Sequence, residues 1–342
     1  MSRKIRLGIV GLRFGEDIIR HLLPPYPDHA LFEIAGCYDL NTSRRDTVAH
    51  RWKLPVHDSL EAMLEDKSIE AIGLFTPPAG RAALIQTIVE AGKHVVTTKP
   101  IEFDPEKLAT SLRVARDRRR VVHVNSPSPR PTPDLRQIDQ WREQFDMGRL
   151  VSIRGEVWAS YCERADQSWY DDPVACPAAP VLRLGVYLLN DFIHFAGEPL
   201  QIRPMTERLR TGRPTADNAT LQLRFANGCL GSIFASFCVE DGDSYRNSLI
   251  LNFENGTIYR NCGPYRSTYG MRESEVTLVR GTGCRRTEAH CVMFDAISGN
   301  YLWSDFYQDI LSDAPISRAY EARLLESART IARLSSAEEA LT

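Results

Sequence analysis

The sequence predicts an α/β protein of two domains, with a doubly wound parallel sheet in residues 1–125 and an α+β domain with a large open mixed or antiparallel sheet in residues 126–342. Two patterns predict this organisation. Short apolar strands alternate with helical segments through the first third of the chain, which is typical of βαβ units. Further along, Asn227-Gly228 and Asn255-Gly256 each separate two strand-like runs and indicate hairpins.

Length and composition fit a soluble globular protein and exclude two classes of partner. The chain has 342 residues, enough for two domains, and its 42 basic and 44 acidic residues create no field that would attract nucleic acid. No apolar run approaches the roughly 20 residues of a membrane span, and the N-terminus lacks a signal-peptide pattern. Eight scattered cysteines favour reduced thiols, and no side-chain spacing suggests a metal site. We therefore expect a cytoplasmic protein without metal, nucleic acid or membrane partners.

The chain begins with a strand, a glycine turn and a helix. Ile5–Val10 is an apolar run of strand length, and a helical period follows the turn. Glycines let the backbone approach a pyrophosphate, and a helix N-terminus offers N–H groups and partial positive charge. The Gly-x-Gly-x-x-Gly pattern is imperfect, because Arg13 and Glu16 stand at its second and third positions, so an ordinary strand-to-helix turn is the alternative. The candidates for contact with a dinucleotide are Gly11, Leu12, Arg13, Phe14 and Gly15.

An acidic residue follows the second expected strand, Phe32–Tyr38. Asp39 stands where a carboxylate accepts hydrogen bonds from the adenosine ribose of NAD and repels the 2′-phosphate of NADP. This favours NAD, although Arg44 and Arg45 nearby keep NADP open. The alternative is that Asp39 caps the helix that begins near Ser43.

The alternation continues to the end of the first domain. Helices are expected at 43–52, 59–65, 81–91 and 105–118, and strands at 71–75, 94–97 and 121–125. Ligands of such sheets lie at the carboxyl ends of the strands. The residues that follow two of these strands, Thr76, Pro77, Pro78 and Lys99, therefore join the cofactor-binding candidates.

The second domain follows a proline-dense segment, residues 126–133, which reads as a stiff connector. A helix is expected at 134–145 and a long amphipathic helix at 320–341. Strands are expected at 148–158, 220–225, 230–237, 249–253 and 257–259. An open sheet face needs a cover, and dimerisation commonly supplies it, so we expect a homodimer or homotetramer assembled through this sheet.

A second cluster of chemically useful side chains lies on one expected helix. Tyr187, Asn190, Asp191 and His194 are spaced to share a helix face, which brings a phenol, an amide and a carboxylate together. For Tyr187 the alternative is a core aromatic with a satisfied hydroxyl, and for His194 it is a packed or solvated histidine.

These motifs stand in the order seen in the glucose–fructose oxidoreductase / inositol dehydrogenase (Gfo/Idh/MocA) family, which the chain resembles over most of its length. The motifs are Gly8-Ile-Val-Gly11, Tyr38-Asp39, Thr76-Pro77-Pro78, Gly92 to Pro100, Gly185-Val-Tyr187-Leu-Leu-Asn190 and Gly197-Glu-Pro199. The resemblance implies an N-terminal Rossmann domain for NAD (NADP possible) and a C-terminal substrate domain.

Several positions depart from the family pattern. Thr98 stands where glutamate usually precedes Lys-Pro, Arg81 where histidine is usual, and Arg183 where aspartate is usual. A guanidinium at position 183 favours an anionic substrate such as a sugar acid or phosphate. The alternative is that Arg183 forms a salt bridge with Asp191 or Glu163.

The resemblance implies hydride transfer between nicotinamide and a secondary alcohol of a sugar, cyclitol or sugar acid. Tyr187 is the candidate proton donor or acceptor, and the Lys99 ammonium beside it would favour the phenolate. Asn190, Asp191 and Arg183 are the substrate-binding candidates. The rival is a catalytically degenerate member that serves as a ligand-binding, regulatory or partner subunit. A lyase or glycosidase that uses transient oxidation at bound NAD is a further alternative.

Overall fold

The computed structural model describes residues 3–24, 27–160, 163–242, 245–263, 273–283, 285–294, 302–313 and 316–339. The chain divides into two compact units: unit 1 comprises Met1–Ser128 and Tyr301–Leu325, and unit 2 comprises Pro129–Asn300 and Glu326–Thr342. The boundary near residue 128 lies close to the one expected at 125. Residues 301–325, which the sequence analysis placed in the second domain, group with unit 1.

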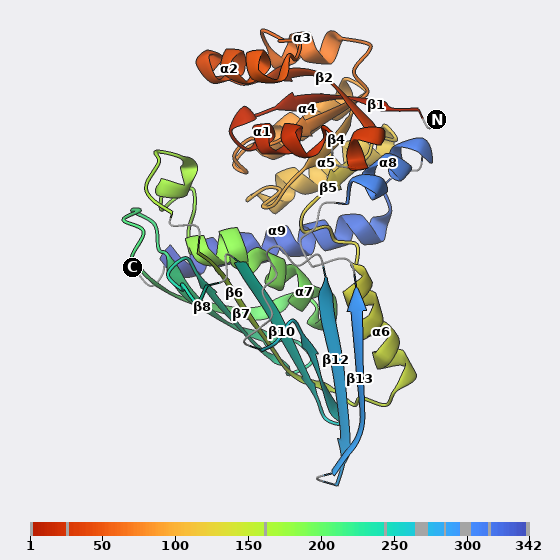
Figure 1. Ribbon diagram of the computed structural model, residues 1–342, viewed down its shortest axis with the longest axis vertical. Coiled ribbons are helices and arrows are strands. Elements are labelled where there is room, and N and C mark those ends of the chain that lie inside the picture. The colour runs from red at the N-terminus through yellow and green to blue at the C-terminus, as the bar shows by residue number, and fades with distance from the viewer. Residues whose placement is uncertain are drawn as a thin grey trace. The chain divides into compact units, whose positions relative to one another are not determined.

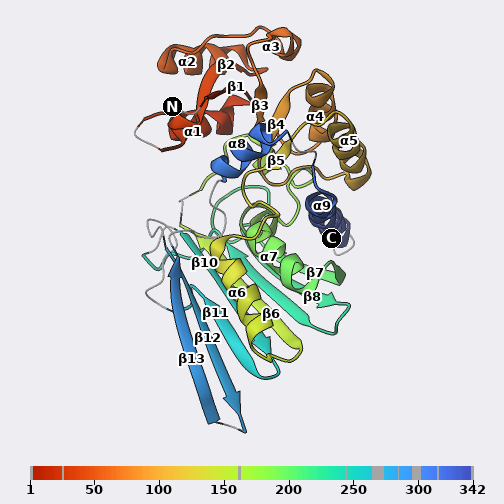
Figure 2. The ribbon, with the colours of Figure 1, turned by 90° about the vertical axis from the view of Figure 1, so that its right-hand side faces the viewer.

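Unit 1 contains a parallel sheet, as predicted. Among the described residues its strands are β1 (Ile5–Val10), β2 (Phe32–Tyr38), β3 (Ala71–Leu74), β4 (His94–Thr97) and β5 (Val122–Val124), in the order β2-β1-β3-β4-β5 (Figures 1 and 2). All neighbouring pairs are parallel. The strand order reverses between β1 and β3, and ligands of doubly wound sheets bind at this switch point.

Five helices of unit 1 follow or precede the strands of its sheet, and side chains cap three of them. They are α1 (Leu12–His21), α2 (Thr42–Trp52), α3 (Leu60–Glu65), α4 (Arg81–Glu90) and α5 (Pro105–Asp117), with a short 3₁₀ turn at Pro27–Ala30. The side chains of Asn41, Ser59 and Asp104 accept backbone hydrogen bonds at the starts of α2, α3 and α5. These polar residues stand just before apolar helical periods, so the sequence predicts the helix starts within one or two residues.

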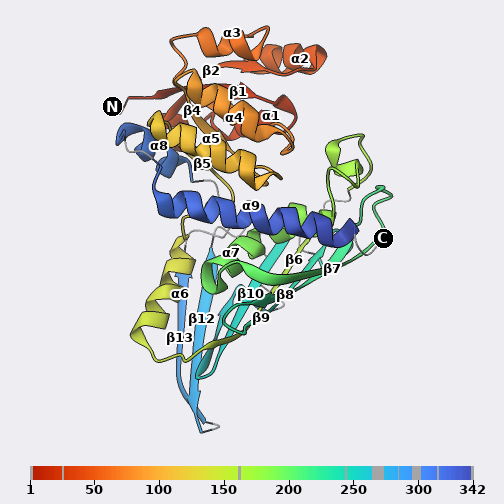
Figure 3. The same cartoon turned by 180° about the vertical axis from the view of Figure 1, so that it is seen from behind.

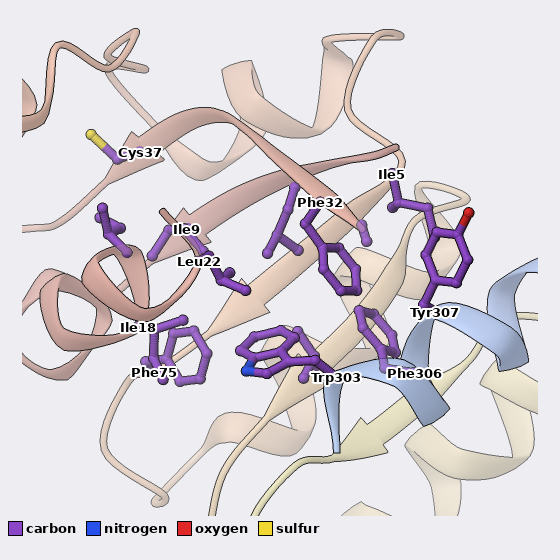
Figure 4. Close-up of a cluster of buried hydrophobic side chains, with 14 of the residues drawn as sticks. Ile5, Ile9, Ile18, Leu22, Phe32, Cys37, Phe75, Trp303, Phe306 and Tyr307 are labelled. Carbon is purple, nitrogen blue, oxygen red and sulfur yellow. The ribbon is translucent and has the colours of Figure 1, made fainter. Parts of the chain in front are cut away.

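An aromatic cluster attaches the C-terminal segment to unit 1. Helix α8 (Trp303–Leu311) places Trp303 and Phe306 against Phe32 of β2, with ring centroids 5.4 and 5.9 Å apart. Figure 4 shows these rings on the same side of the sheet as Ile18 of α1. Burial of this apolar surface explains why residues 301–325 belong to unit 1.

Unit 2 contains a mixed sheet. In its described part the strands are β6 (Leu150–Ala159), β7 (Pro199–Glu207), β8 (Asn218–Phe225), β9 (Leu230–Ser236), β10 (Tyr245–Phe253), β11 (Gly256–Arg260), β12 (Ser274–Thr282) and β13 (Arg285–Phe294). The order is β13-β12-β11-β10-β6-β9-β8-β7, with β6 and β9 parallel and the other pairs antiparallel. Both predicted hairpins are confirmed, as β8–β9 and β10–β11.

The sequence analysis did not anticipate β7, β12, β13 or helix α8. Strands β7 and β13 form the two edges of the sheet, and β7 contains Pro199 and Pro204, which local pattern reading takes as breaks. Their strand conformation depends on pairing with β8 and β12 rather than on local propensity.

Helices cover one face of this sheet (Figures 2 and 3). They are α6 (Pro133–Gln144), the π-helical turn η3 (Val181–Gly185) and α7 (Val186–Ala196). Unit 2 also contains the C-terminal part of α9 (Arg318–Glu339) and a 3₁₀ turn at Trp169–Asp171. A Cβ at Gly155 of β6 would lie 2.8 Å from Leu188 of α7. The close approach of α7 to the sheet therefore depends on this glycine.

No helix in the described ranges is long and apolar enough to cross a membrane. The cysteines in these ranges are thiols rather than disulfides, as predicted. Burial raises the pKa of Cys37, Cys229 and Cys238 to about 11, which makes their thiolates scarce at neutral pH. Cys162 and Cys284 lie outside the described residues, as does Leu341 at the end of the helix expected at 320–341.

Replacing Phe306 by Ala should lower the free energy of unfolding by about 3–5 kcal/mol, because a fully buried ring leaves a cavity against Phe32. Urea denaturation followed by tryptophan fluorescence would measure the loss. The exposed Leu40→Ala variant, on the same unit, is the control and should change stability by less than about 0.5 kcal/mol. Equal losses in the two variants would contradict the role of the cluster.

Candidate functional site

The turn after β1 is shaped by two glycines. Gly11 has φ +86°, and a Cβ there would lie 2.8 Å from the carbonyl carbon and oxygen of Phe75 and 2.9 Å from the nitrogen of Thr76. A Cβ at Gly15 would lie 2.9 Å from Ile9 of β1. The first glycine therefore lets the turn touch the end of β3, and the second lets α1 pack on β1. These are two of the roles that glycines play in dinucleotide-binding turns.

Two residues break the glycine pattern of this turn, Arg13 and Glu16. The side chain of Arg13 is exposed, and Phe14 packs edge-on against Phe75 with ring centroids 5.8 Å apart. The Glu16 carboxylate pairs with Arg51 and accepts a hydrogen bond from the indole of Trp52 at 3.1 Å, both in α2. The negative charge that could repel an anionic ligand is therefore neutralised within the protein.

Asp39 lies against this turn. It is 8% exposed; its Oδ2 accepts a hydrogen bond from the N–H of Leu12 at 2.7 Å, and its Oδ1 accepts one from Asn41 at 2.8 Å. The Arg44 guanidinium lies 3.5 Å from Oδ1. The N-cap of α2 is Asn41, whose side chain accepts from the Arg44 N–H. Asp39 thus joins the end of β2 to the start of α1.

The ends of β3, β4 and β5 complete this edge of the sheet. The Thr98 hydroxyl donates to the carbonyl oxygen of Ser126 at 3.2 Å, and the N–H of half-buried Lys99 donates to the same oxygen at 3.3 Å. Thr76 Oγ1 is buried and has no hydrogen-bond partner among the described residues. The turn at Gly11, Thr76 with Pro77 and Pro78, and Lys99 all follow the carboxyl ends of adjacent strands. This edge offers a close backbone approach and an orphaned buried hydroxyl, which fits the cofactor expected from the sequence.

In unit 2, the residues that the sequence predicts to share one face of helix α7 differ in burial. Tyr187 and Asn190 are half-buried, whereas Asp191 is 1% exposed and bonds Arg260 of β11 at 2.7 Å. Burial raises the pKa of Asp191, and the neighbouring Arg260 charge opposes that rise. Asp134 lies 3.9 Å from the same guanidinium. Asp191 therefore belongs to a buried charge cluster with Arg260 and Asp134.

The other charged side chains of this segment are also paired. His194 Nε2 lies 2.7 Å from Asp139 of α6. Both terminal nitrogens of Arg183 bond Glu163, and the guanidinium lies 3.9 Å from the ring centroid of Tyr170 and 4.3 Å from that of Phe237. This is one of the two ion pairs considered as the alternative to anion binding. A guanidinium held by a carboxylate between two rings is poorly placed to receive a second anion.

The sequence analysis noted Arg81 only because it departs from the family pattern. It did not identify Glu102 or Arg260 as buried side chains that hold parts of the fold together. All three are buried charges that meet partners far along the chain. No local spacing signals such pairs. No group of three or more metal-ligating side chains occurs within the described ranges.

Two family models match the chain. One, described as "Oxidoreductase family, NAD-binding Rossmann fold", matches residues 5–126; the other, described as "GFO/IDH/MocA C-terminal domain", matches residues 135–259. Together they cover most of the chain and assign the glycine turn of unit 1 to an NAD-binding domain.

Two curated relatives are each 23% identical to the chain over the aligned residues. UDP-N-acetylglucosamine 3-dehydrogenase of Acidithiobacillus ferrooxidans is 23% identical over 261 residues, which is 73% of this chain and 77% of that protein. Levoglucosan dehydrogenase of Pseudarthrobacter phenanthrenivorans is 23% identical over 227 residues, which is 56% of this chain and 58% of that protein.

Solved structures share the fold. Levoglucosan dehydrogenase in complex with NADH and levoglucosan aligns with a TM-score of 0.74 and 17% identity, covering 99% of this chain and 98% of the other. A variant of a 3-ketoreductase from Actinomadura kijaniata, in complex with TDP-benzene and NADP, aligns with a TM-score of 0.68 and 19% identity over 96% of both chains.

Replacing Gly11 by Ala should weaken NADH binding at least about tenfold, because the new Cβ meets the backbone of Phe75 and Thr76. Quenching of tryptophan fluorescence during NADH titration would measure the affinity. The matched control is Gly92→Ala, which also has a positive φ but whose Cβ meets nothing within 4 Å. A similar loss in both variants would mean that backbone strain, and not the close approach, is responsible.

Proposed function

Because this chain belongs to the Gfo/Idh/MocA oxidoreductase family and its first unit is that family's NAD-binding Rossmann domain, we propose that it transfers hydride between nicotinamide and a secondary alcohol of a sugar, cyclitol or sugar acid, or the corresponding ketone. The relatives named above act on sugar derivatives, which supports this substrate class. The observation that carries the proposal is the turn at Gly11 pressed against Phe75 and Thr76, with Lys99 following β4 on the same sheet edge.

NAD is the preferred cofactor in this proposal. A bound nicotinamide supplies or accepts the hydride, while the protein binds and orients the reactants. Leu12 at the start of α1 and the exposed residues of the turn would lie against the pyrophosphate, and Asp39 would face the adenosine ribose. The buried carboxylate of Asp39 disfavours a 2′-phosphate, whereas Arg44 at 3.5 Å reduces that repulsion. We therefore expect NADH to bind more tightly than NADPH, with NADPH still measurable.

Lys99 and Tyr187 are the proposed catalytic residues. The Tyr187 hydroxyl would give a proton to the substrate oxygen or take one from it, and the Lys99 ammonium would supply positive charge at the cofactor edge of unit 1. Asn190, one helical turn from Tyr187, would hydrogen-bond a substrate hydroxyl. We assign Arg183 and Asp191 to holding the structure around α7, since each is bound by a partner of opposite charge.

The reaction is tested by titrating the purified chain with NADH and NADPH and then assaying a panel of sugars, cyclitols and sugar acids. Lys99→Met and Tyr187→Phe should each lower kcat about 10²–10⁴-fold while leaving the protein folded. Exposed Lys67→Met and half-buried Tyr259→Phe are the matched controls. Binding of NADH without turnover of any substrate in the panel would instead support the ligand-binding or regulatory alternative.

A second copy of the chain is the proposed cover for the open face of the unit 2 sheet. Opposite α6 and α7, this face carries exposed Met205, Leu230 and Met293 (70%, 59% and 43% exposed). These side chains lie on β7, β9 and β13 and are spread from one edge of the sheet to the other, so the proposal rests on the open sheet face as a whole rather than on one apolar patch. We also propose a cytoplasmic location, where the cysteines stay reduced.

Sedimentation equilibrium should find a dimer or tetramer, and Leu230→Asp should shift it toward the monomer by placing a charge in the interface. Leu40→Asp, at an exposed position of unit 1, should leave the assembly unchanged. A monomeric wild-type chain at micromolar concentration would contradict the proposed interface.

A further inference from the structure

One buried arginine joins the two connections that follow β3 and β4. Arg81 is the first residue of α4 and is 2% exposed. Its Nη1 donates hydrogen bonds to the carbonyl oxygens of Thr98 (2.8 Å), Pro100 and Ile101 (3.5 Å), and its Nη2 donates to that of Thr76. The guanidinium thus spans the residues that flank Lys99 and the residue that carries the orphaned hydroxyl.

The chemistry of these contacts suits arginine in particular. A guanidinium presents several N–H donors in one rigid plane, so it can hold carbonyl oxygens of two separate segments at a set spacing. An ammonium carries its donors at a single point and could not reach all of them together. The charge is buried, so the surrounding carbonyl oxygens must stay in place to replace its lost hydration.

Other contacts hold the same segment from both sides. Glu102, also buried, accepts a hydrogen bond from the N–H of Ala82 in α4 at 2.8 Å and one from Phe103 at 2.7 Å. On the far side, Ser126 after β5 accepts from Thr98 and Lys99. The segment that contains Lys99 is therefore fixed to the connections of both neighbouring strands, and Arg81 supplies the contact toward β3.

We propose that Arg81 is a positioning residue for the cofactor: it sets the distance between the Thr76 connection and the Lys99 segment so that both meet one bound nicotinamide nucleotide. This inference rests on the proposed function, because the two segments form the same cofactor edge. A purely structural arginine would contribute to stability alone. A positioning arginine contributes also to the affinity for NADH and to the rate of hydride transfer.

The experiment compares Arg81→Met and Arg81→Lys with Lys93→Met. Lys93 is the matched control, because it is another buried cation of unit 1, and its Nζ donates to the carbonyl oxygens of Asp66 and Ile69 (both 2.7 Å) before β4 rather than after it. All variants are assayed for melting temperature and for NADH affinity at a temperature where each is folded.

We expect Arg81→Met to raise the dissociation constant of NADH about tenfold, because the hydrogen bonds that hold the two segments at a set spacing are lost, and Arg81→Lys to raise it less. Lys93→Met should lower the melting temperature but leave NADH affinity within about twofold. In Arg81→Ala, millimolar guanidinium ion should restore part of the affinity, and methylammonium should not. Where the methionine variant does not fold, the lysine variant carries the comparison.

The outcomes separate this inference from the proposed function. If the wild-type chain binds NADH and the Arg81 variants bind it equally well, the positioning role is overturned while the cofactor assignment stands. Equal losses of affinity in Arg81→Met and Lys93→Met would also overturn it, because a general loss of stability would then explain both. Failure of the wild-type chain to bind NADH would overturn the proposed function itself, and this inference with it.

Discussion

The contact between the turn after β1 and the end of β3 is the constraint on which the candidate site depends. Gly11 has no Cβ, so the backbone of Phe75 and Thr76 occupies the space that a side chain would need. Because β1 and β3 adjoin at the switch point of the sheet, this contact brings the N-terminus of α1 beside the β3 connection. Asp39 then secures the same turn from β2 through the Leu12 N–H. The shape of this sheet edge therefore depends on contacts of the backbone rather than on contacts between side chains.

Each unit buries an arginine that bonds several polar partners. Arg81 in unit 1 bonds carbonyl oxygens, and Arg260 in unit 2 bonds Asp191 and Asn247 beneath α7. Burying such groups is costly, and removing one partner of a buried pair typically costs about 3–5 kcal/mol. Their benefit is a defined geometry rather than high stability. Arg260 thereby links β11 to the helix that carries Tyr187 and Asn190.

Several departures from the family pattern are matched by partners elsewhere in the chain. Thr98 replaces the usual acid, and its hydroxyl bonds Ser126; Glu16 is neutralised by Arg51. Arg183 is matched by Glu163, so a cation and an anion together occupy the place of the usual aspartate. At each of these positions the changed charge or hydroxyl is engaged by a partner within the protein.

The sequence by itself determined the alternation of strands and helices, the helix starts at polar caps, the hairpins at Asn-Gly and the order of the family motifs. These features depend on side chains a few residues apart, so local physics specifies them. Only the tertiary structure decided that α8 packs on Phe32, that edge strands such as β7 pair despite their prolines, and that Arg81, Arg183 and Asp191 are each engaged by distant partners. Burial and ion pairing join residues tens or hundreds of positions apart, and no local pattern records which charge will meet which.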